Sequence, residues 1–592
     1  MVKHEATTRP RGTKAAFRAA NSQAPFHTGH VACHLRNARL TDTSTSPEDC
    51  HEMASPSTVD PWTRALIWMR RDMKRAWAMW LPVAAFFTLA LVQARLPGLY
   101  MDAVNPDFVA AQLLHHSARQ PGAGIPSKIF PILGGLYYGA QNLYVGLPIF
   151  ALFGCNIITL RIAQALFGAM LIAALYLVSV RLTRSRMLAF ACTLGIATDL
   201  AFTASFRTQF YIVMSAAAWL FAALALALPT GTRSDFGRKR LLLSGACTGL
   251  ACYGYFVLGF FIPGMFLLIV WRRRDGWRDL PVWLTGLMIG LLPYVLGYLS
   301  LLVKLKGLEP TLAFVRYMLG QLHPFDAGGA SHGNLAYAWN MIQLSVMDRG
   351  NEAMIFGHPL PSGWPMTKYA GFLISLAVIS ILLVVRVIRR SDKLVQTLPA
   401  LLPWSFIGIA SLFGNRLWAH HFSVLVPFAY LLGTLLLLEC LDALRASHSL
   451  RRAIIAAALC IGIGCNLMQQ TTFHQELART GGTGKMPEAL NTLAEEARAS
   501  PPHVAYLFPE WGFYASFNFL TGNRVRYADN VEAHTLTQLR HRGYSTFRLA
   551  FWDEADYERY RQIMLDAGAQ NVTERVYTRR DGVPAFYLIE AE

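Results

Sequence analysis

The sequence predicts a polytopic α-helical membrane protein with about eleven spans, followed by a small α/β domain. Of its 592 residues, 54% are hydrophobic and only 15% are charged, whereas soluble domains carry nearer a quarter of charged residues. The hydrophobic residues are gathered in runs long enough to cross a bilayer. After residue 469 these runs stop, and short alternating helical and strand patterns follow. A secreted soluble protein, a disordered chain and a fibrous repeat are thereby excluded.

Eleven hydrophobic segments are predicted to span the membrane. The run 241–271 is read as a hairpin of two short helices, because Arg240 precedes it, Arg272 follows it, and basic flanks prefer the same cytoplasmic side. Gly254 and Gly259 are expected to provide its bend. The predicted spans are 77–95, 157–182, 187–205, 209–228, 241–256, 257–271, 281–303, 369–388, 398–413, 418–439 and 453–469.

The basic loops also predict the orientation, with the N-terminus inside and the C-terminus outside a bacterial-type inner membrane. Residues 96–156 and 304–368 then become long exported loops of a transmembrane domain that covers 61–470. The hydrophobic stretch 131–154 is taken as interfacial or re-entrant, because a further span there would invert every later loop. Residues 1–60 are expected to be a disordered cytoplasmic tail, or an over-extended start with Met53 as the initiator.

Residues 471–592 are predicted to form an exported α/β domain. A helix is expected at 487–499 and a strand at 503–508, and segments 532–542, 546–551, 554–567, 571–578 and 585–590 continue the alternation. The domain contains neither a GxGxxG motif nor a P-loop, so nucleotide binding has no support. The net charge of +18 lies mostly in short loops beside hydrophobic segments, so it predicts membrane orientation and no nucleic-acid partner.

Polar residues collect on the side of the membrane that the orientation makes the outside. They are Asp102, Asp107 and Lys128 in the first long loop, Asp199, Arg207 and Gln209 around the next turn, His323 and Asp326 in the second long loop, and Arg416, His420 and His421 at the last turn. We expect these clusters to meet at one face. Such a layout suits an enzyme whose substrate has a lipid tail in the bilayer and a phosphate at headgroup depth.

Three segments resemble the glycosyltransferase C superfamily, over roughly residues 77–469. They are LPGLYMDAVNPDFVAA after the first span, RIAQALFGAMLIAALYLVSVRL followed by FRTQFYIVM, and WAHHFSVLVPFAYLLGTLLLL near the end. The pattern is most similar to protein mannosyltransferases and lipid A aminoarabinose transferases. This resemblance implies inverting transfer of a sugar from a polyprenyl-phosphate carrier to an envelope glycolipid, glycan or protein, with membrane lipids as the other partners.

Asp102 is the candidate general base, because inverting transfer needs a carboxylate to take the acceptor's proton. Many relatives have an Asp-Glu pair, whereas here Ala103 follows Asp102 and the second carboxylate is Asp107. Which of the two is the base therefore stays open, and Asp107 could instead be an ordinary acid at a helix start.

Arg207 is the first candidate for the donor phosphate, since arginine binds phosphate oxygens with two parallel hydrogen bonds. Lys128, Arg416, His420 and His421 are secondary candidates, and each cation could alternatively extend to lipid headgroups. The preferred partner of Asp199 is Arg207, with a place in the cavity wall as the alternative, and Gln209 is expected to support the site.

The acceptor is expected to meet His323 and Asp326, although this signal is weak and no metal ligation is predicted there. No cofactor is predicted; a divalent cation is compatible with the chemistry but has no support in the sequence. Glu510 and Trp511 could face a sugar, and a structural turn followed by a helix is the simpler interpretation. The alternative functions are a transporter or flippase of lipid-linked sugars, a polysaccharide polymerase or ligase, and a non-catalytic scaffold.

Overall fold

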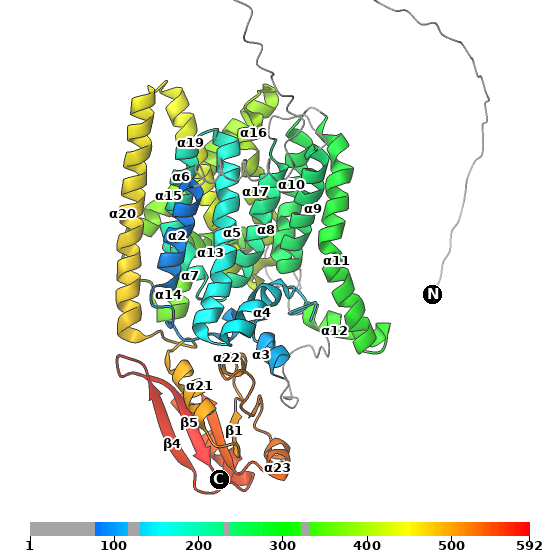
Figure 1. Ribbon diagram of the computed structural model, residues 1–592, viewed down its shortest axis with the longest axis vertical. Coiled ribbons are helices and arrows are strands. Elements are labelled where there is room, and N and C mark those ends of the chain that lie inside the picture. Colours follow the sequence, from blue (N-terminus) through cyan, green and yellow to red (C-terminus); the bar gives the residue numbers. More distant parts are fainter. Residues whose placement is uncertain (1–76, 116–130, 230–235, 274, 321–331) are drawn as a thin grey trace, which may run out of the picture. The chain divides into compact units, whose positions relative to one another are not determined.

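The computed structural model describes residues 77–115, 131–229, 236–273, 275–320 and 332–592. All described residues belong to one compact unit, 69–592. Within that unit a bundle of helices leads into one C-terminal sheet (Figure 1). The predicted N-terminal tail, 1–60, and the candidate site residues Lys128, His323 and Asp326 lie outside the described residues.

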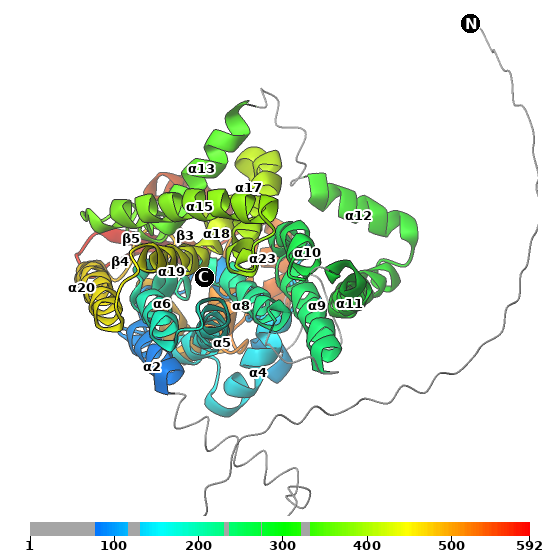
Figure 2. The ribbon, with the colours of Figure 1, turned by 90° about the horizontal axis from the view of Figure 1, so that it is seen from above.

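Seven helical segments of the described chain are long and hydrophobic enough to cross a membrane. Figure 2 shows several of them nearly end-on, side by side in a bundle. The number of spans, eleven, and their orientation stay predictions. The seven segments are α5 (Ile157–Thr183), α8 (Phe210–Ala227), Gly276–Lys304 with α11 (Leu280–Lys304), α15 (Trp364–Ile388), Leu394–Gly414 with α16 (Leu394–Thr397) and α17 (Leu401–Ala410), Ala419–Ala443 with α18 (Ala419–Phe422) and α19 (Leu425–Ala443), and α20 (His448–Thr480).

The remaining predicted spans correspond to shorter or less hydrophobic helices, which are α2 (Trp77–Leu91), α6 (Arg186–Thr198), α9 (Phe236–Gly254) and α10 (Ile262–Trp271). The expected bend is present, because α9 ends at Gly254 and a 3₁₀ turn, η2 (Phe256–Phe261), precedes α10. Glycines also allow the backbones of α9 and α11 to pack closely. A side chain at Gly245 would not fit, because its Cβ would lie 2.0 Å from the Trp283 carbonyl oxygen.

The segment 187–205 is not one continuous helix, in contrast to the prediction. It breaks at Asp199 into α6 and a short helix, α7 (Leu200–Ser205). The Asp199 backbone is extended, and its carboxylate accepts a hydrogen bond from the Phe202 amide at 3.2 Å. An aspartate that caps a new helix therefore interrupts the hydrophobic run.

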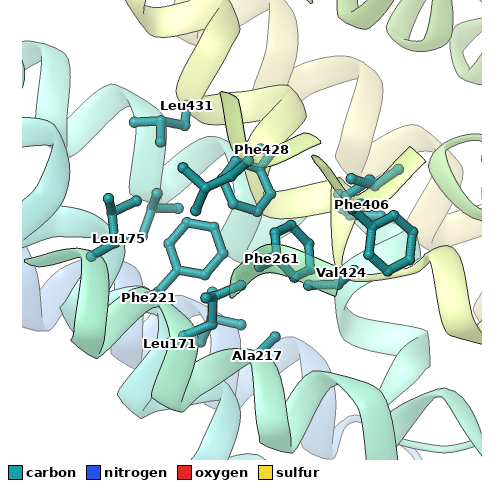
Figure 3. Packing of buried hydrophobic residues seen from close by; sticks show 14 of the residues in the cluster. Leu171, Leu175, Ala217, Phe221, Phe261, Phe406, Val424, Phe428 and Leu431 are labelled. Carbon is teal, nitrogen blue, oxygen red and sulfur yellow. The ribbon is translucent and has the colours of Figure 1, made fainter. Parts of the chain in front are cut away.

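Aromatic rings from distant segments hold the centre of the bundle together (Figure 3). Phe221 of α8 packs on Phe428 of α19, with ring centroids 4.8 Å apart. Phe261 of η2 stacks on Phe428 at 5.6 Å and on Phe406 of α17 at 5.0 Å. These contacts fix η2, which lies next to the candidate site, against the late helices.

The two long loops contain short helices. The hydrophobic stretch 131–154 forms α4 (Gln141–Phe153), whose thirteen residues fall short of the ~20 needed for a span. This length fits the prediction that the stretch does not cross the membrane. The other loop helices are η1 (Met101–Ala103) and α3 (Val109–Leu114) in the first loop, and α12 (Leu308–Gly320), α13 (His332–Val346) and α14 (Arg349–Phe356) in the second.

The C-terminal α/β domain is confirmed. Helix α20 continues to Thr480, beyond the predicted boundary at 470, and ends at Gly481 with φ of +71°. The five-stranded sheet has the order β2-β1-β3-β5-β4, with β1 parallel to β2 and β3, and β5 antiparallel to β3 and β4. The elements are α21 (Ala489–Ala499), β1 (Val504–Leu507), α22 (Tyr514–Leu520), β2 (Tyr527–Ala528), α23 (Ala533–His541), β3 (Thr546–Phe551), α24 (Tyr557–Asp566), β4 (Thr573–Thr578) and β5 (Pro584–Ala591).

The first loop and the α/β domain share one hydrophobic core. Leu99 and Met101 are buried in the same cluster as Leu490 and Phe513 of the domain. The Arg95 carbonyl oxygen accepts a hydrogen bond from the Asn491 side chain at 3.1 Å. The segment that carries Asp102 is thus packed directly against the C-terminal domain.

Candidate active site

A cavity of about 550 Å³ brings together segments that are far apart in the sequence. Five predicted site residues line it: Asp102, Gln209, Arg416, His420 and His421. They come from η1, the turn before α8, and the region from η5 (Ser411–Arg416) to α18. The cavity wall therefore contains one of the predicted carboxylates together with basic and amide side chains.

Asp102 lies in η1, between Met101 and Ala103, whose side chains are buried. Burial raises the pKa of Asp102 to about 6, and a hydrogen bond from the Tyr100 side chain opposes part of this rise. The carboxylate is partly buried and faces the cavity. At neutral pH it is mostly ionised and can accept a proton.

Asp107 differs from Asp102 in its surroundings. It is fully buried and does not line the cavity. Its Oδ2 accepts a hydrogen bond from the Tyr211 hydroxyl at 3.3 Å, and its Oδ1 has no hydrogen-bond partner. Burial raises its pKa to about 7. Between the two predicted carboxylates, only Asp102 has access to the cavity.

The two histidines are held by polar neighbours from other segments. His420 Nδ1 lies 3.2 Å from Gln209 Nε2, and His421 Nε2 lies 3.1 Å from the Tyr255 hydroxyl. Their ring centroids are 3.9 Å apart. Arg416 reaches the same cavity from the preceding turn. His421 Nδ1 also accepts a hydrogen bond from the Trp418 amide at 2.9 Å, so its Nε2–H is the group that donates to the Tyr255 oxygen. Arg416, His420 and the Tyr255 hydroxyl can donate hydrogen bonds to one anionic ligand.

Arg207 lies outside the cavity, in contrast to its predicted place as the first phosphate ligand. Its side chain is buried, and its guanidinium donates to the carbonyl oxygens of Ala90 at 3.1 Å and Leu96 at 2.9 Å. Further bonds go to the carbonyls of Leu89, Val92 and Gln93. Arg207 thus satisfies carbonyl groups that the end of α2 leaves without helical partners.

Asp199 pairs with a different cation from the one predicted. Lys368 Nζ of α15 lies 2.7 Å from Asp199 Oδ2, and the Tyr430 hydroxyl donates to the same oxygen at 2.6 Å. Asp199 does not line the cavity with Asp102. The expectation of an Asp199–Arg207 pair is therefore wrong. Lys368 is 169 residues away in sequence, and no local pattern links it to Asp199.

Aromatic side chains form much of the cavity wall, and most of them were not predicted. Tyr138 stacks on Tyr255, with ring centroids 6.2 Å apart. The available signals were the clusters GLYYG, GYF and EWGFY, which sequence reasoning treated mainly as hydrophobic or structural. The aromatic lining residues are Phe108, Tyr137, Tyr138, Tyr255, Phe256, Phe314, Trp418, Trp511 and Tyr514.

Of the two neighbouring residues Glu510 and Trp511, which could face a sugar, only one lies at the cavity. Trp511 lines the cavity. Glu510 instead accepts hydrogen bonds from the Trp552 amide at 2.9 Å and the Tyr560 hydroxyl at 3.0 Å, inside the C-terminal domain. Its carboxylate supports the turn and is not among the side chains that line the cavity. No group of three or more His, Cys, Asp or Glu residues that could hold a metal ion occurs within the described residues.

Comparison with known proteins identifies the fold. No protein-family model matches the chain, and no curated protein matches it. The crystal structure of ArnT from Cupriavidus metallidurans bound to undecaprenyl phosphate has a TM-score of 0.55, at 14% identity over 86% of this chain and 97% of that one. Its apo form has a TM-score of 0.51, at 13% identity over 89% and 98% of the two chains.

A cryo-EM structure of the arabinofuranosyltransferase AftD from Mycobacteria is also similar, with a TM-score of 0.35 at 15% identity over 87% of this chain and 41% of that one. The ArnT likeness extends over nearly the whole length of both chains. The chain therefore has the fold of ArnT, as the resemblance seen in the sequence predicts.

Proposed function

We propose that this protein is a membrane glycosyltransferase that moves a sugar from a polyprenyl-phosphate donor to an envelope acceptor. The observation that carries the proposal is the shared cavity, in which Asp102 meets Arg416, His420 and His421. The fold of ArnT supports it, because the solved ArnT complex contains undecaprenyl phosphate. The acceptor is a glycolipid, a glycan or a protein, and the site faces the exported side of a bacterial-type inner membrane.

Asp102 acts as the general base in this proposal. Its carboxylate takes the proton of the acceptor's nucleophile while that atom attacks the anomeric carbon. A bond from the acceptor to the sugar forms as the bond from the sugar to the phosphate oxygen breaks. Attack from the face opposite the leaving group inverts the anomeric configuration. The cavity access of Asp102 favours it over Asp107 for this role.

Arg416 and His420 hold the phosphate of the donor and of the departing polyprenyl phosphate, and His421 holds the Tyr255 hydroxyl beside them. Negative charge grows on the leaving phosphate, and donors fixed in place beforehand stabilise it. The contacts of Gln209 with His420 and of Tyr255 with His421 fix the two imidazoles before substrate binds. Arg207 is not assigned to phosphate binding, because its guanidinium already donates hydrogen bonds to carbonyl oxygens at the end of α2.

The first prediction concerns Asp102→Asn in the purified, full-length protein reconstituted in proteoliposomes. We expect kcat to fall by about 10²- to 10⁴-fold, because the amide cannot accept the proton. Donors and acceptors are first identified by mass spectrometry of envelope lipids, glycans and proteins from cells with and without the gene. Transfer is then measured with the matching polyprenyl-phosphate sugar.

Asp392→Asn is the matched control, because Asp392 is exposed and does not line the cavity. It should keep wild-type activity. Normal transfer by the Asp102→Asn protein would overturn the assignment of the base. An envelope that is unchanged when the gene is removed, together with no transfer in vitro, would overturn the proposed function itself.

A further inference from the structure

The wall of the cavity includes one half-exposed tryptophan that the proposed reaction does not use. Tryptophan side chains are usually well covered in folded proteins. Trp511, in the turn before α22, is 50% exposed and lines the cavity together with Asp102, although the two are far apart in sequence. Its ring therefore offers an uncovered aromatic surface to a ligand in the cavity.

The backbone at Trp511 is fixed by the α/β domain. The Trp552 indole donates to the Trp511 carbonyl oxygen at 2.9 Å, and its ring stacks on Phe513 with centroids 4.0 Å apart. The Glu510 carboxylate accepts a hydrogen bond from the Trp552 amide at 2.9 Å. These contacts use the backbone of Trp511 and the side chains of its neighbours, so they remain when the Trp511 side chain is shortened. The turn is thus arranged before any ligand binds.

A second ring stands at a right angle to Trp511. Tyr514 has its ring centroid 6.3 Å from that of Trp511, and the two ring planes are 90° apart. Tyr514 lines the cavity as well, and it stacks on Tyr527 inside the domain with centroids 6.3 Å apart. The α/β domain therefore contributes an aromatic corner to the cavity wall.

The chemistry of this corner favours a sugar ring. The face of an aromatic ring is negatively polarised, so it attracts the slightly positive hydrogens of C–H groups. A pyranose has several C–H groups on one face, and its hydroxyls point outward from the ring. It can cover the Trp511 ring and still direct hydroxyls toward the polar side chains of the cavity. A peptide with a reacting Ser or Thr hydroxyl has no comparable face.

The packing of the Asp102 segment assigns this surface to the acceptor. Asp102 takes the proton of the acceptor's nucleophile in the proposed reaction, so the acceptor must lie beside it. Met101, the neighbour of Asp102, shares a buried cluster with Phe513, two residues after Trp511. The cations that hold the donor phosphate, Arg416 and His420, come instead from the helical bundle. The α/β domain therefore lies on the acceptor's side of the site.

We propose that the acceptor is a carbohydrate, a glycan or a glycolipid, and that one of its pyranose rings stacks on Trp511. This inference rests on the proposed function and narrows its acceptor class, because it excludes a protein acceptor. Trp511 binds substrate in this proposal and takes no part in proton transfer. The stack forms equally in the ground state and the transition state, so its loss should raise KM and leave kcat nearly the same.

The first test is steady-state transfer by the full-length protein in proteoliposomes, with the donor and the acceptor that mass spectrometry of the envelope identifies. We expect Trp511→Ala to raise the KM of the acceptor about tenfold, with no change in the KM of the donor. Trp511→Phe keeps an aromatic face and should raise the acceptor KM by only about two- to threefold.

Trp277→Ala is the matched control for the loss of an exposed tryptophan. Trp277, in η3 (Gly276–Asp279), is 61% exposed and does not line the cavity. Its replacement should leave both KM values and kcat at the wild-type level. An equal rise of the acceptor KM in Trp277→Ala would overturn the assignment to Trp511.

The second test detects binding at Trp511 without turnover. Full-length Asp102→Asn protein is labelled with 5-fluorotryptophan, and the spectrum of the same protein with Trp511→Phe identifies the Trp511 fluorine signal. The probes are the oligosaccharides released from the envelope by mild acid and the tryptic peptides of the envelope proteins. We expect the oligosaccharides to shift the Trp511 signal and the peptides to leave it in place.

The outcomes separate this inference from the proposed function. Sugar transfer by the wild-type protein with an unchanged acceptor KM in Trp511→Ala, or with a change confined to the donor KM, would overturn the inference alone. A Trp511 signal that the oligosaccharides do not shift would also overturn it. A shift by the oligosaccharides, together with no transfer by the wild-type protein, would support the sugar-binding surface and overturn the proposed function.

Discussion

Asp102 is subject to two opposing effects that together set its pKa. Burial raises the pKa to about 6, and the hydrogen bond from Tyr100 lowers it. Because the general base must be ionised, the proposed reaction needs a pH above this value. The surroundings of one side chain therefore decide the working range of the site.

The second prediction is the pH dependence of wild-type transfer. We expect kcat/KM to be constant above pH 7 and to fall tenfold per pH unit below about pH 6, as Asp102 becomes protonated. An ordinary aspartate, with a pKa of about 3.9, would keep full activity down to about pH 5. Steady-state transfer assays between pH 4.5 and 8.5 measure this fall in kcat/KM, with protein integrity checked at each pH by chromatography. Full activity at pH 5 would contradict the assignment.

Arg207 and Asp199 show which residue roles a sequence can predict. Arg207 was placed correctly at a turn between hydrophobic helices, because hydrophobic runs and charges locate helix ends, whereas Asp199 was placed inside a helix that it in fact interrupts. Their partners were not predictable: α2 supplies the carbonyls for Arg207, and Lys368 of α15 pairs with Asp199. Such pairings depend on how distant helices pack, and no local pattern in one sequence records that.

At the scale of elements, α14 connects two parts of the cavity wall. Its Asn351 accepts a hydrogen bond from Thr208 Oγ1 at 2.7 Å and donates to Asp348 at 2.8 Å. Gly350 packs against Phe210 and Ala419, which are neighbours of Gln209 and His420. The helix therefore sets the distance between the turn before α8 and the start of α18.

The third prediction is that Asn351→Ala lowers kcat by about ten- to a hundredfold, because a small displacement of the turn misplaces Gln209 and His420. The loss of the buried bond should also lower the free energy of unfolding by about 1–3 kcal/mol. Sugar-transfer kinetics and thermal unfolding in detergent measure the two effects separately.

Gln470→Ala is the matched control, because Gln470 donates a similar buried bond to Thr203 Oγ1 at 2.6 Å, away from the cavity. It should lose comparable stability and keep kcat. Equal kcat values for the two variants would show that α14 has no special role at the site.

Hydrophobic runs predicted the long helices α5, α8 and α15 to within a few residues, because a span needs a continuous apolar surface. The strands β1 and β3 were also predicted. Helix α14 was missed, since it is short and polar. The two-residue strand β2 was missed as well, because it is defined only by its pairing with β1.

At the scale of the whole described unit, the α/β domain and the helical bundle meet at Gly98. A Cβ at this position would lie 1.9 Å from the Pro487 carbonyl oxygen, which is backbone and cannot move aside easily. The contact lies in the segment that leads to Asp102, so the two parts of the unit depend on each other for their geometry.

The fourth prediction is that Gly98→Ala lowers the free energy of unfolding by about 1–3 kcal/mol through this overlap. Thermal unfolding of the full-length protein in detergent, followed by tryptophan fluorescence, should show a lower Tm. Gly371→Ala is the control, because a Cβ there would meet nothing within 4 Å and alanine favours a helix. An unchanged Tm for Gly98→Ala would contradict the close contact.

Helix α20 has a further consequence for the whole unit. Its 33 residues amount to about 50 Å of helix, well beyond the ~30 Å of a hydrocarbon core. The last turns of α20 lead to the α/β domain (Figure 1), and their Phe473 and Leu477 pack in one buried cluster with Leu200 of α7 and Ile355 of α14. Each residue added near the end of α20 would rotate the following chain by about 100° and shift it by about 1.5 Å along the helix axis. The number of residues in α20 therefore helps to determine where the α/β domain, and with it Trp511, lies relative to the cavity.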